Sequence, residues 1–411
     1  MIRRGLLSAY FEGVAVKRLS MVETTPGGSN QHEFNASKEL RRLFGDEDRR
    51  RIPARFIWLG EEQEGVTADS VVSWYDARRK HLTRTEYRLF YSSNNVTRLM
   101  KAGDTFFLAL RRDGSVMVIV TAAESTVQNQ LLWLFGMDEQ PALEFAVRES
   151  IPDKDAELDF TVRYILDELG IDFEEPETDE LDGLIEQFGM RFPTTRDFST
   201  LARNSLSHIS PLDNPDAVLM AWLEREELLF RRLERHLVAD RLRSGFMEDD
   251  DSADVDGFLS FSLSVQNRRK SRAGQSLENH LEAIFVARNL RYSRGAETEN
   301  RNKPDFLFPG QTEYRDANFS PTLLTMLASK STLKDRWRQV LPEASRIPDK
   351  HLFTLEPAIS ENQTDQMKAE RLQLVLPAKL HETYRPSQRA WLMDVADFIG
   401  VVIKRQLQGK L

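Results

Sequence analysis

The chain has 411 residues, 40% of them hydrophobic, and a formal net charge of -9. This length exceeds that of a usual single domain, so we expect two or three domains, each with a core of its own. The sequence contains no cysteine, which excludes disulfides, zinc-thiolate sites and a thiol nucleophile.

No apolar run is long enough to span a membrane, and charges interrupt the opening segment where a signal peptide would be apolar. We therefore expect a soluble, cytoplasmic protein with no membrane partner. The negative net charge argues against a nucleic-acid partner, because phosphate binding depends on lysine and arginine. The charges are segregated, however: acids concentrate at 167–182 and 248–256, and bases at 78–88 and 268–272. This pattern is compatible with a nucleic-acid binder that has acidic spacers.

Residues 1–166 are predicted to form a mainly β domain. The run FFLALRRDGSVMVIV places two β-rich segments on either side of Asp113-Gly114, which predicts a hairpin. Arg84, Glu86 and Arg88 alternate along a predicted strand and would point to one face. That face would either contact a DNA groove or carry an ion pair on an exposed strand.

An acidic segment, 167–186, is predicted to link this domain to a second one at 187–411. Residues 196–243 have apolar positions three and four apart, typical of a bundled or dimer-packing helix. The basic residues just before Gly274 are predicted to form a loop ahead of the first core helix. That loop would clamp DNA phosphates or simply be solvated, and its bases are Arg268, Arg269, Lys270 and Arg272.

After residue 274 the pattern predicts a mixed α/β domain with a central sheet. Leu277, Leu281 and Phe285 recur at helical spacing. The elements expected next are a strand at 304–308, a strand ending near Lys330, a helix over about 334–347, strands HLFTL and RLQLVL, and a helix over roughly 388–406.

Three side chains in this region suit phosphodiester hydrolysis, which needs a divalent cation and a group that positions water. Asp305 is expected at a strand start, Lys330 at a strand end, and Glu343 on the face of the 334–347 helix that also carries Arg336. Alternatively, the three are a turn residue, a solvated strand end and a surface acid, and their spacing alone favours this alternative.

The surrounding segments favour the hydrolytic site over three unrelated surface residues, because they resemble the EcoRII-type restriction endonucleases. The similar segments are SVQNRRKSRAGQSLENHLEAIF, NKPDFLFP, LASKSTLKDRWRQVLPEA and HLFTLEPAIS, in this order. The resemblance covers most of 187–411 and is weaker in the N-terminal half. There, VKRLS at 16–20, GGSNQH at 27–32 and TRTEYR at 83–88 are similar to the DNA-reading elements of the family's effector domain.

This resemblance implies a PD-(D/E)xK nuclease core that uses Mg²⁺ and follows an N-terminal, B3-like β pseudobarrel. Asp305 and Glu343 would bind the metal, and Lys330 would be the catalytic lysine. Glu278, on the first core helix, would lie near the metal site or be a solvated helix residue. Pro342 stands inside the expected helix and predicts a kink that displaces Glu343.

The resemblance also assigns DNA contacts. Lys334, Asp335 and Arg336 would read CC/GG steps, because lysine and arginine donate to guanine and aspartate accepts from cytosine. The alternative is a first helical turn of mixed charge. The effector-domain contacts would be Lys17, His32, Arg84, Glu86 and Arg88.

The expected protein is therefore a homodimeric type II restriction endonuclease of the IIE kind. It would cleave double-stranded DNA at a CC(N)GG-like site and be autoinhibited until a second DNA copy binds the N-terminal domain. Two alternatives stay open: a DNA-binding regulator with an inactive nuclease core, and an assembly role for the 196–243 helices.

Overall fold

The computed structural model divides the chain into two compact units, residues 1–176 with 358–362 and residues 177–357 with 363–411, and the main boundary falls between Pro176 and Glu177. This boundary lies inside the acidic segment expected to be a linker. The structure describes residues 10–24, 32–60, 64–81, 83–137, 140–149, 151, 160–168, 179–189, 191–247 and 252–409. Within these ranges, none of the helices combines the length and the hydrophobicity needed to cross a membrane.

The N-terminal unit is built on an eight-stranded sheet with the order β2-β5-β4-β3-β7-β6-β1-β8. Neighbouring strands are antiparallel except for the parallel pair β3 and β7. The expected hairpin joins β6 to β7, and Gly114 provides its positive φ of 78°. The strands are β1 (Phe11–Arg18), β2 (Glu33–Asn35), β3 (Arg49–Leu59), β4 (Glu64–Asp76), β5 (Tyr87–Tyr91), β6 (Thr105–Arg111), β7 (Val116–Thr121) and β8 (Ala146–Arg148).

This sheet curls around one core and is covered on its other face. Phe34 of edge strand β2 lies 4.7 Å from Phe106 of β6 and 5.8 Å from Phe145, between ring centroids, so distant strands share an interior. Strands β6 and β7 are apolar at successive positions because both of their faces are buried. Helices α3 (Thr126–Leu134) and α4 (Phe160–Glu168) pack on the outer face, whereas α2 (Lys38–Phe44) joins the inner core and α1 (Met21–Thr24) is largely exposed.

The C-terminal unit contains the mixed sheet that the sequence predicted, with the order β13-β12-β11-β10-β9. The pairs β9/β10 and β10/β11 are antiparallel, whereas β11/β12 and β12/β13 are parallel. The strands are β9 (Ser293–Arg294), β10 (Phe306–Phe308), β11 (Thr325–Lys330), β12 (Lys350–Thr354) and β13 (Leu372–Val375).

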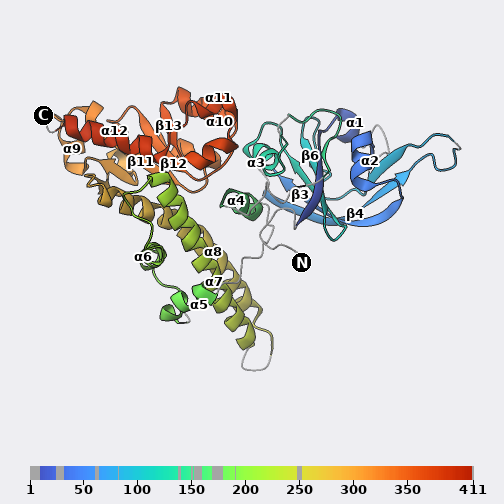
Figure 1. Ribbon diagram of the computed structural model, residues 1–411, viewed down its shortest axis with the longest axis horizontal. Coiled ribbons are helices and arrows are strands. Elements are labelled where there is room, and N and C mark those ends of the chain that lie inside the picture. Colours follow the sequence, from blue (N-terminus) through green and yellow to red (C-terminus); the bar gives the residue numbers. More distant parts are fainter. Residues whose placement is uncertain are drawn as a thin grey trace. The chain divides into compact units, whose positions relative to one another are not determined.

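Two long helices, α7 (Pro215–Ser244) and α8 (Val255–Ala287), run side by side in this unit (Figure 1). Asn214 caps the start of α7, and Gly245, with φ 76°, ends it. Near its C-terminal end, α8 buries the apolar stripe that the sequence predicted, and its Phe285 ring lies 5.2 Å from Phe306. The shorter helices are α5 (Asp179–Ile185), η2 (Glu186–Phe188), α6 (Thr195–Ser205), η3 (Glu299–Arg301), α9 (Gln311–Arg315), η4 (Pro321–Leu323), η5 (Lys334–Val340), α10 (Glu361–Ala369), η6 (Ala378–Thr383), α11 (Pro386–Arg389) and α12 (Val395–Gln408).

Four expectations about local structure were wrong. The basic residues 268–272 lie in the middle of α8 and not in a loop, because α8 begins at Val255. The helix expected over 334–347 ends at Val340 and is a 3-10 helix. The last predicted helix, 388–406, is split into α11 and α12. Strand β5 begins at Tyr87, so Arg84 and Glu86 precede it and only Arg88 lies in the strand.

Candidate active site

Asp305 and Lys330 are brought together by the pairing of two antiparallel strands. Phe306 of β10 pairs with Leu327 of β11, which places Asp305 beside the last residues of β11. One carboxylate oxygen, Asp305 Oδ2, accepts a hydrogen bond from the backbone N–H of Ser329 at 2.6 Å and lies 3.5 Å from Lys330 Nζ. The first two members of the predicted triad therefore form a partly exposed ion pair where β10 begins and β11 ends.

Glu343 reaches the same region from a turn, not from a helix. Its backbone N–H donates to Val340 O at 3.1 Å, where η5 ends. The preceding carbonyl, Pro342 O, accepts from Asn302 Nδ2 at 3.1 Å. Pro342 lies beyond the helix end, so it interrupts no helical hydrogen bond and the expected kink does not occur.

The environment of Glu343 is unusual for a carboxylate. Its Oε2 atom is buried and has no hydrogen-bond partner in the part of the chain that the structure describes. Burial raises the pKa of Glu343 to about 7; the negative charge of Asp305 raises it too, while Lys330 and Lys350 act in the opposite direction. Glu343 is thus electrostatically coupled to both other members of the triad, and it has an oxygen that needs a partner.

Glu278, on α8, belongs to the same electrostatic environment. Burial and the charge of Asp305 raise its pKa, and a salt bridge to Arg294 of 2.8 Å opposes the rise. Glu278 is therefore a partly buried, ion-paired side chain and not a freely solvated one. No sequence pattern indicated Arg294, because its partners lie on a different element, α8.

The donors present fit a hard divalent cation. Mg²⁺ in proteins is usually held by one or two carboxylates, with waters completing its coordination. Asp305 and Glu343 provide two carboxylates, and the buried Glu343 oxygen has no hydrogen-bond donor among the described residues. Among the described residues, no group of three histidine or acidic side chains forms a complete metal cage. A two-carboxylate site for Mg²⁺ agrees with that finding.

The segment expected to read bases begins at the N-terminus of η5. Trp337 and Val340 are buried and anchor this short helix, whereas Arg336 is exposed. The backbone of Lys334 and Asp335 is part of η5, but their side chains lie outside the described residues. Of the three expected base-reading side chains, only Arg336 is therefore located by the structure.

The basic cluster of α8 is divided between different partners. Arg269 forms a salt bridge of 2.5 Å with the buried Glu234 of α7. Arg272 pairs with Glu226, at 3.3 Å, and with Glu227, both also on α7. The side chain of Lys270 lies outside the described residues.

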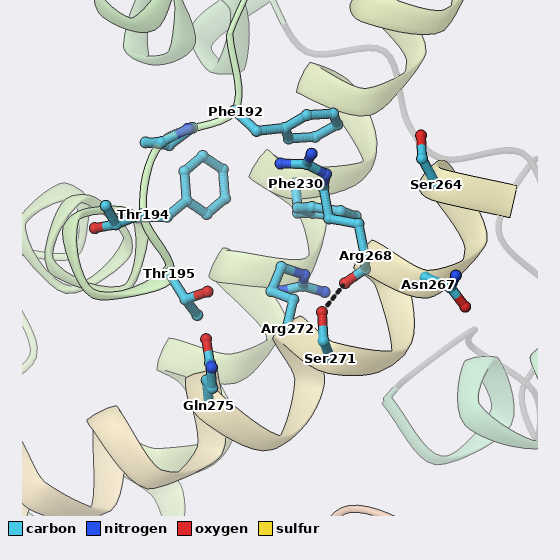
Figure 2. A pocket seen from close by; sticks show the side chains of 12 residues that line it. Phe192, Thr194, Thr195, Phe230, Ser264, Asn267, Arg268, Ser271, Arg272 and Gln275 are labelled. Atoms are coloured by element: carbon cyan, nitrogen blue, oxygen red, sulfur yellow. Dashed lines mark hydrogen bonds between the residues drawn. The ribbon is translucent and has the colours of Figure 1, made fainter. Parts of the chain in front are cut away.

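Arg268 instead lines a cleft of about 620 Å³ between α6, α7 and α8 (Figure 2). Its guanidinium lies 4.3 Å from the ring centroid of Phe192, and the neighbouring Arg272 lies 4.0 Å from that of Phe230. Arg272 is nonetheless tied to the α7 acids, whereas Arg268 has no salt bridge among the described residues. Arg268 is the arginine of this cluster that is available to a polyanion.

Two of the expected effector-domain contacts, Lys17 and Arg88, lie on different strands but share a cleft. Lys17 is buried, pairs with Glu23 and lies 5.2 Å from the Phe145 ring centroid. Lys17 and Arg88 both line a second cleft of about 620 Å³. Of the remaining three residues, His32 packs on Tyr91 at 5.4 Å between ring centroids, Glu86 pairs with Arg88 at 2.6 Å, and Arg84 is exposed.

Comparison with known proteins gives consistent matches. The family model described as "EcoRII C terminal" matches residues 230–399. The chain is 33% identical over 402 residues to the type II restriction enzyme EcoRII of Escherichia coli. This match covers 95% of this chain and 93% of the relative.

Solved structures with similar folds include metal-depleted Ecl18kI in complex with uncleaved, modified DNA, with a TM-score of 0.43, 16% identity and coverage of 56% of this chain and 84% of that one. A complex of the restriction endonuclease PspGI with substrate DNA matches with a TM-score of 0.44 and 14% identity. The match covers 53% of this chain and 94% of the PspGI chain.

Proposed function

Because the chain belongs to the EcoRII family of type II restriction enzymes and is thus a site-specific deoxyribonuclease, we propose that it hydrolyses DNA at Asp305, Lys330 and Glu343 with Mg²⁺. The observation that carries this assignment is the unpartnered, buried Glu343 oxygen in the electrostatic field of Asp305. A carboxylate in this state has a strong electrostatic preference for a cation.

Each side chain has a distinct task in this proposal. Asp305 and Glu343 would hold the metal, whose chemistry is to stabilise negative charge on the phosphate oxygens and to favour deprotonation of water. The Ser329 N–H fixes the orientation of the Asp305 carboxylate. Lys330 would orient the attacking water with its ammonium group, since it is held next to Asp305. Hydrolysis would leave a 5′-phosphate.

The direct test is cleavage of plasmid DNA by Lys330→Ala. Removing a group that positions the nucleophile typically costs about 10²–10⁴-fold in rate. Lys368→Ala, which removes an exposed lysine that pairs with Asp365 on α10, is the matched control and should cleave like the wild type. Undiminished cleavage by Lys330→Ala would remove the proposed centre.

For specificity, we propose that Lys334, Asp335 and Arg336 read CC/GG steps in a CC(N)GG-like site. The exposure of Arg336 at the start of an anchored 3-10 helix supports this role. A bidentate contact to guanine contributes about 1–3 kcal/mol of discrimination. Arg336→Ala should therefore relax the cleavage pattern, which sequencing of the digested ends would reveal. An unchanged pattern would exclude Arg336 as a base reader.

For DNA backbone binding, we propose Arg268 and Lys270, while Arg269 and Arg272 hold α8 to α7 through their acidic partners. A pseudo-palindromic site calls for a twofold-symmetric protein, so the active species would be a homodimer. Sedimentation of the full chain with and without a cognate duplex tests this, and a monomer in both states would contradict it.

For regulation, we propose that the N-terminal unit is a B3-like effector domain that binds a second DNA copy and relieves autoinhibition. Its curled sheet, with Lys17 and Arg88 lining one cleft, supports this role. A chain that starts near residue 177 should cut single-site DNA faster than the full chain. Equal or slower cutting would contradict autoinhibition. The alternative of an inactive nuclease core rested on a kink at Pro342, which lies after the end of η5.

A further inference from the structure

Arg294 is fixed by its backbone to the segment that carries Asp305. It lies on β9, where it pairs with Phe306, the residue that directly follows Asp305. The next N–H along the chain, that of Gly295, donates to the Asp305 carbonyl at 3.1 Å. Gly295 has a φ of 62°, so the chain turns away immediately after this bond. The strand that carries Asp305 therefore sets the position of Arg294.

The Arg294 side chain extends from this strand to two successive turns of α8. Its Nε and Nη2 atoms donate to Glu278 Oε2 at 3.2 and 2.8 Å. Its Nη1 atom donates to Glu282 Oε2 at 2.7 Å and to Asn279 Oδ1 at 3.0 Å. All these bonds lie around one planar guanidinium, a geometry that a lysine cannot reproduce.

These bonds leave the other Glu278 oxygen, Oε1, without a protein partner in the described part of the chain. Glu278 lies in the field of Asp305 and Lys330. Glu278 and Glu343 are thus each coupled electrostatically to Asp305 and to Lys330, and Glu278 also forms a salt bridge with Arg294. Lys330 is assigned to the attacking water, so Arg294 is the counter-charge that holds the third acid in place.

We propose that Arg294 is a positioning residue of the nuclease centre, which holds Glu278 beside Asp305 so that its free oxygen faces the metal's water shell. This inference rests on the proposed function, because it assumes that Asp305 and Glu343 bind the metal. Partners that orient groups around a metal site typically contribute about 10–100-fold to metal affinity when they are removed. Arg294 should do so without contacting DNA.

The test is a titration of the full chain with Mn²⁺ alone, followed by electron paramagnetic resonance, since Mn²⁺ accepts the same oxygen ligands as Mg²⁺. Arg294→Met should weaken Mn²⁺ binding by about tenfold or more. Arg294→Lys should give an intermediate loss, because a lysine keeps the charge but cannot bond Glu278 and Glu282 together. In cleavage assays, both variants should shift the half-saturating Mg²⁺ concentration in the same order. DNA affinity in EDTA should not change.

Arg291→Met is the matched control, because Arg291 lies three positions before Arg294 but forms an exposed salt bridge with Glu313. It should bind Mn²⁺ like the wild type. If Arg294→Met does not fold, as judged by circular dichroism, Arg294→Lys carries the test.

Wild-type metal affinity in both Arg294 variants would overturn the inference while leaving the proposed function intact. A loss of DNA affinity in EDTA would also overturn it, since Arg294 would then be a DNA contact. Absence of Mn²⁺ binding by the wild type would overturn the metal site itself, and this inference with it.

Discussion

Replacing Glu343 by glutamine should abolish cleavage and yet stabilise the metal-free C-terminal unit at alkaline pH. The pKa of Glu343 is raised from 4.5 to about 7 by burial, so the folded protein favours the protonated, neutral side chain. Glutamine is neutral at every pH and has nearly the same shape. The substitution therefore removes the cost of a buried charge together with the ability to bind a cation.

The sign of the pH dependence follows from linkage. A group with a raised folded-state pKa stabilises the fold fully below its unfolded pKa, and this contribution is lost as the pH rises through the folded pKa. For Glu343 the loss runs from about 4.5 to about 7. At about 1.4 kcal/mol for each pH unit that separates the two pKa values, it amounts to roughly 3 kcal/mol at pH 8 as an upper figure. For a domain of this size, that corresponds to about 6–12 °C in Tm.

The assay is thermal unfolding of wild type and Glu343→Gln in EDTA at pH 8 and at pH 5. We expect a higher Tm for the variant at pH 8, almost no difference at pH 5, and a rise in Tm with added Mg²⁺ in the wild type alone. Glu370→Gln, an exposed glutamate after α10, is the control and should match the wild type throughout. A Tm difference that is the same at both pH values would refute the reasoning, because it would not come from the titration of Glu343.

Three further changes test how the C-terminal unit is held together and how it meets DNA. Asp216→Ala removes the acceptor of three backbone N–H groups, at 3.0 to 3.1 Å, and should destabilise the unit by about 3 kcal/mol in chemical denaturation. Arg268→Ala should lower the salt dependence of DNA affinity by about one unit of slope without lowering Tm. Arg269→Ala should lower Tm and leave the salt dependence of DNA affinity unchanged. The reason is that it leaves the buried Glu234 unpaired, at a cost of about 3 kcal/mol.

The sequence was most informative about features that a short-range pattern reveals, such as an apolar helical stripe or a charged residue at a strand end. The stripe around Leu281 and Phe285 predicted an amphipathic helix, and both residues are fully buried on α8. Asp305 and Lys330 were placed at the ends of two strands, and the pairing of β10 with β11 brings them to 3.5 Å. In each case a short-range sequence pattern was enough to predict where the residue lies in its own helix or strand.

Long-range partners were the part that the sequence did not reveal. The bases 268–272 were expected in a loop, but they lie within α8, where Arg269 and Arg272 form salt bridges with acids of α7. Helical periodicity does not say which acid of another helix will face a given arginine. The same is true of Arg294, which no motif distinguished and which contacts Glu278 only because β9 joins the sheet next to β10. Pro342 was expected inside a helix with a kink that displaces Glu343; this was wrong, because η5 ends at Val340, before the proline.

The negative net charge and the nuclease centre are reconciled by where the charges lie. Glu226 and Glu234 of α7 form salt bridges with arginines of α8. They therefore do not repel DNA as unpaired charges would. In the centre, by contrast, Glu278 and Glu343 both lie in the field of Asp305, and Glu343 keeps a buried oxygen that has no hydrogen-bond partner among the described residues. A fold gains nothing from gathering like charges in this way, since the cost of burying them remains unless a cation offsets it. The expected instability of the metal-free centre and its proposed affinity for a divalent cation would therefore be two consequences of the same arrangement.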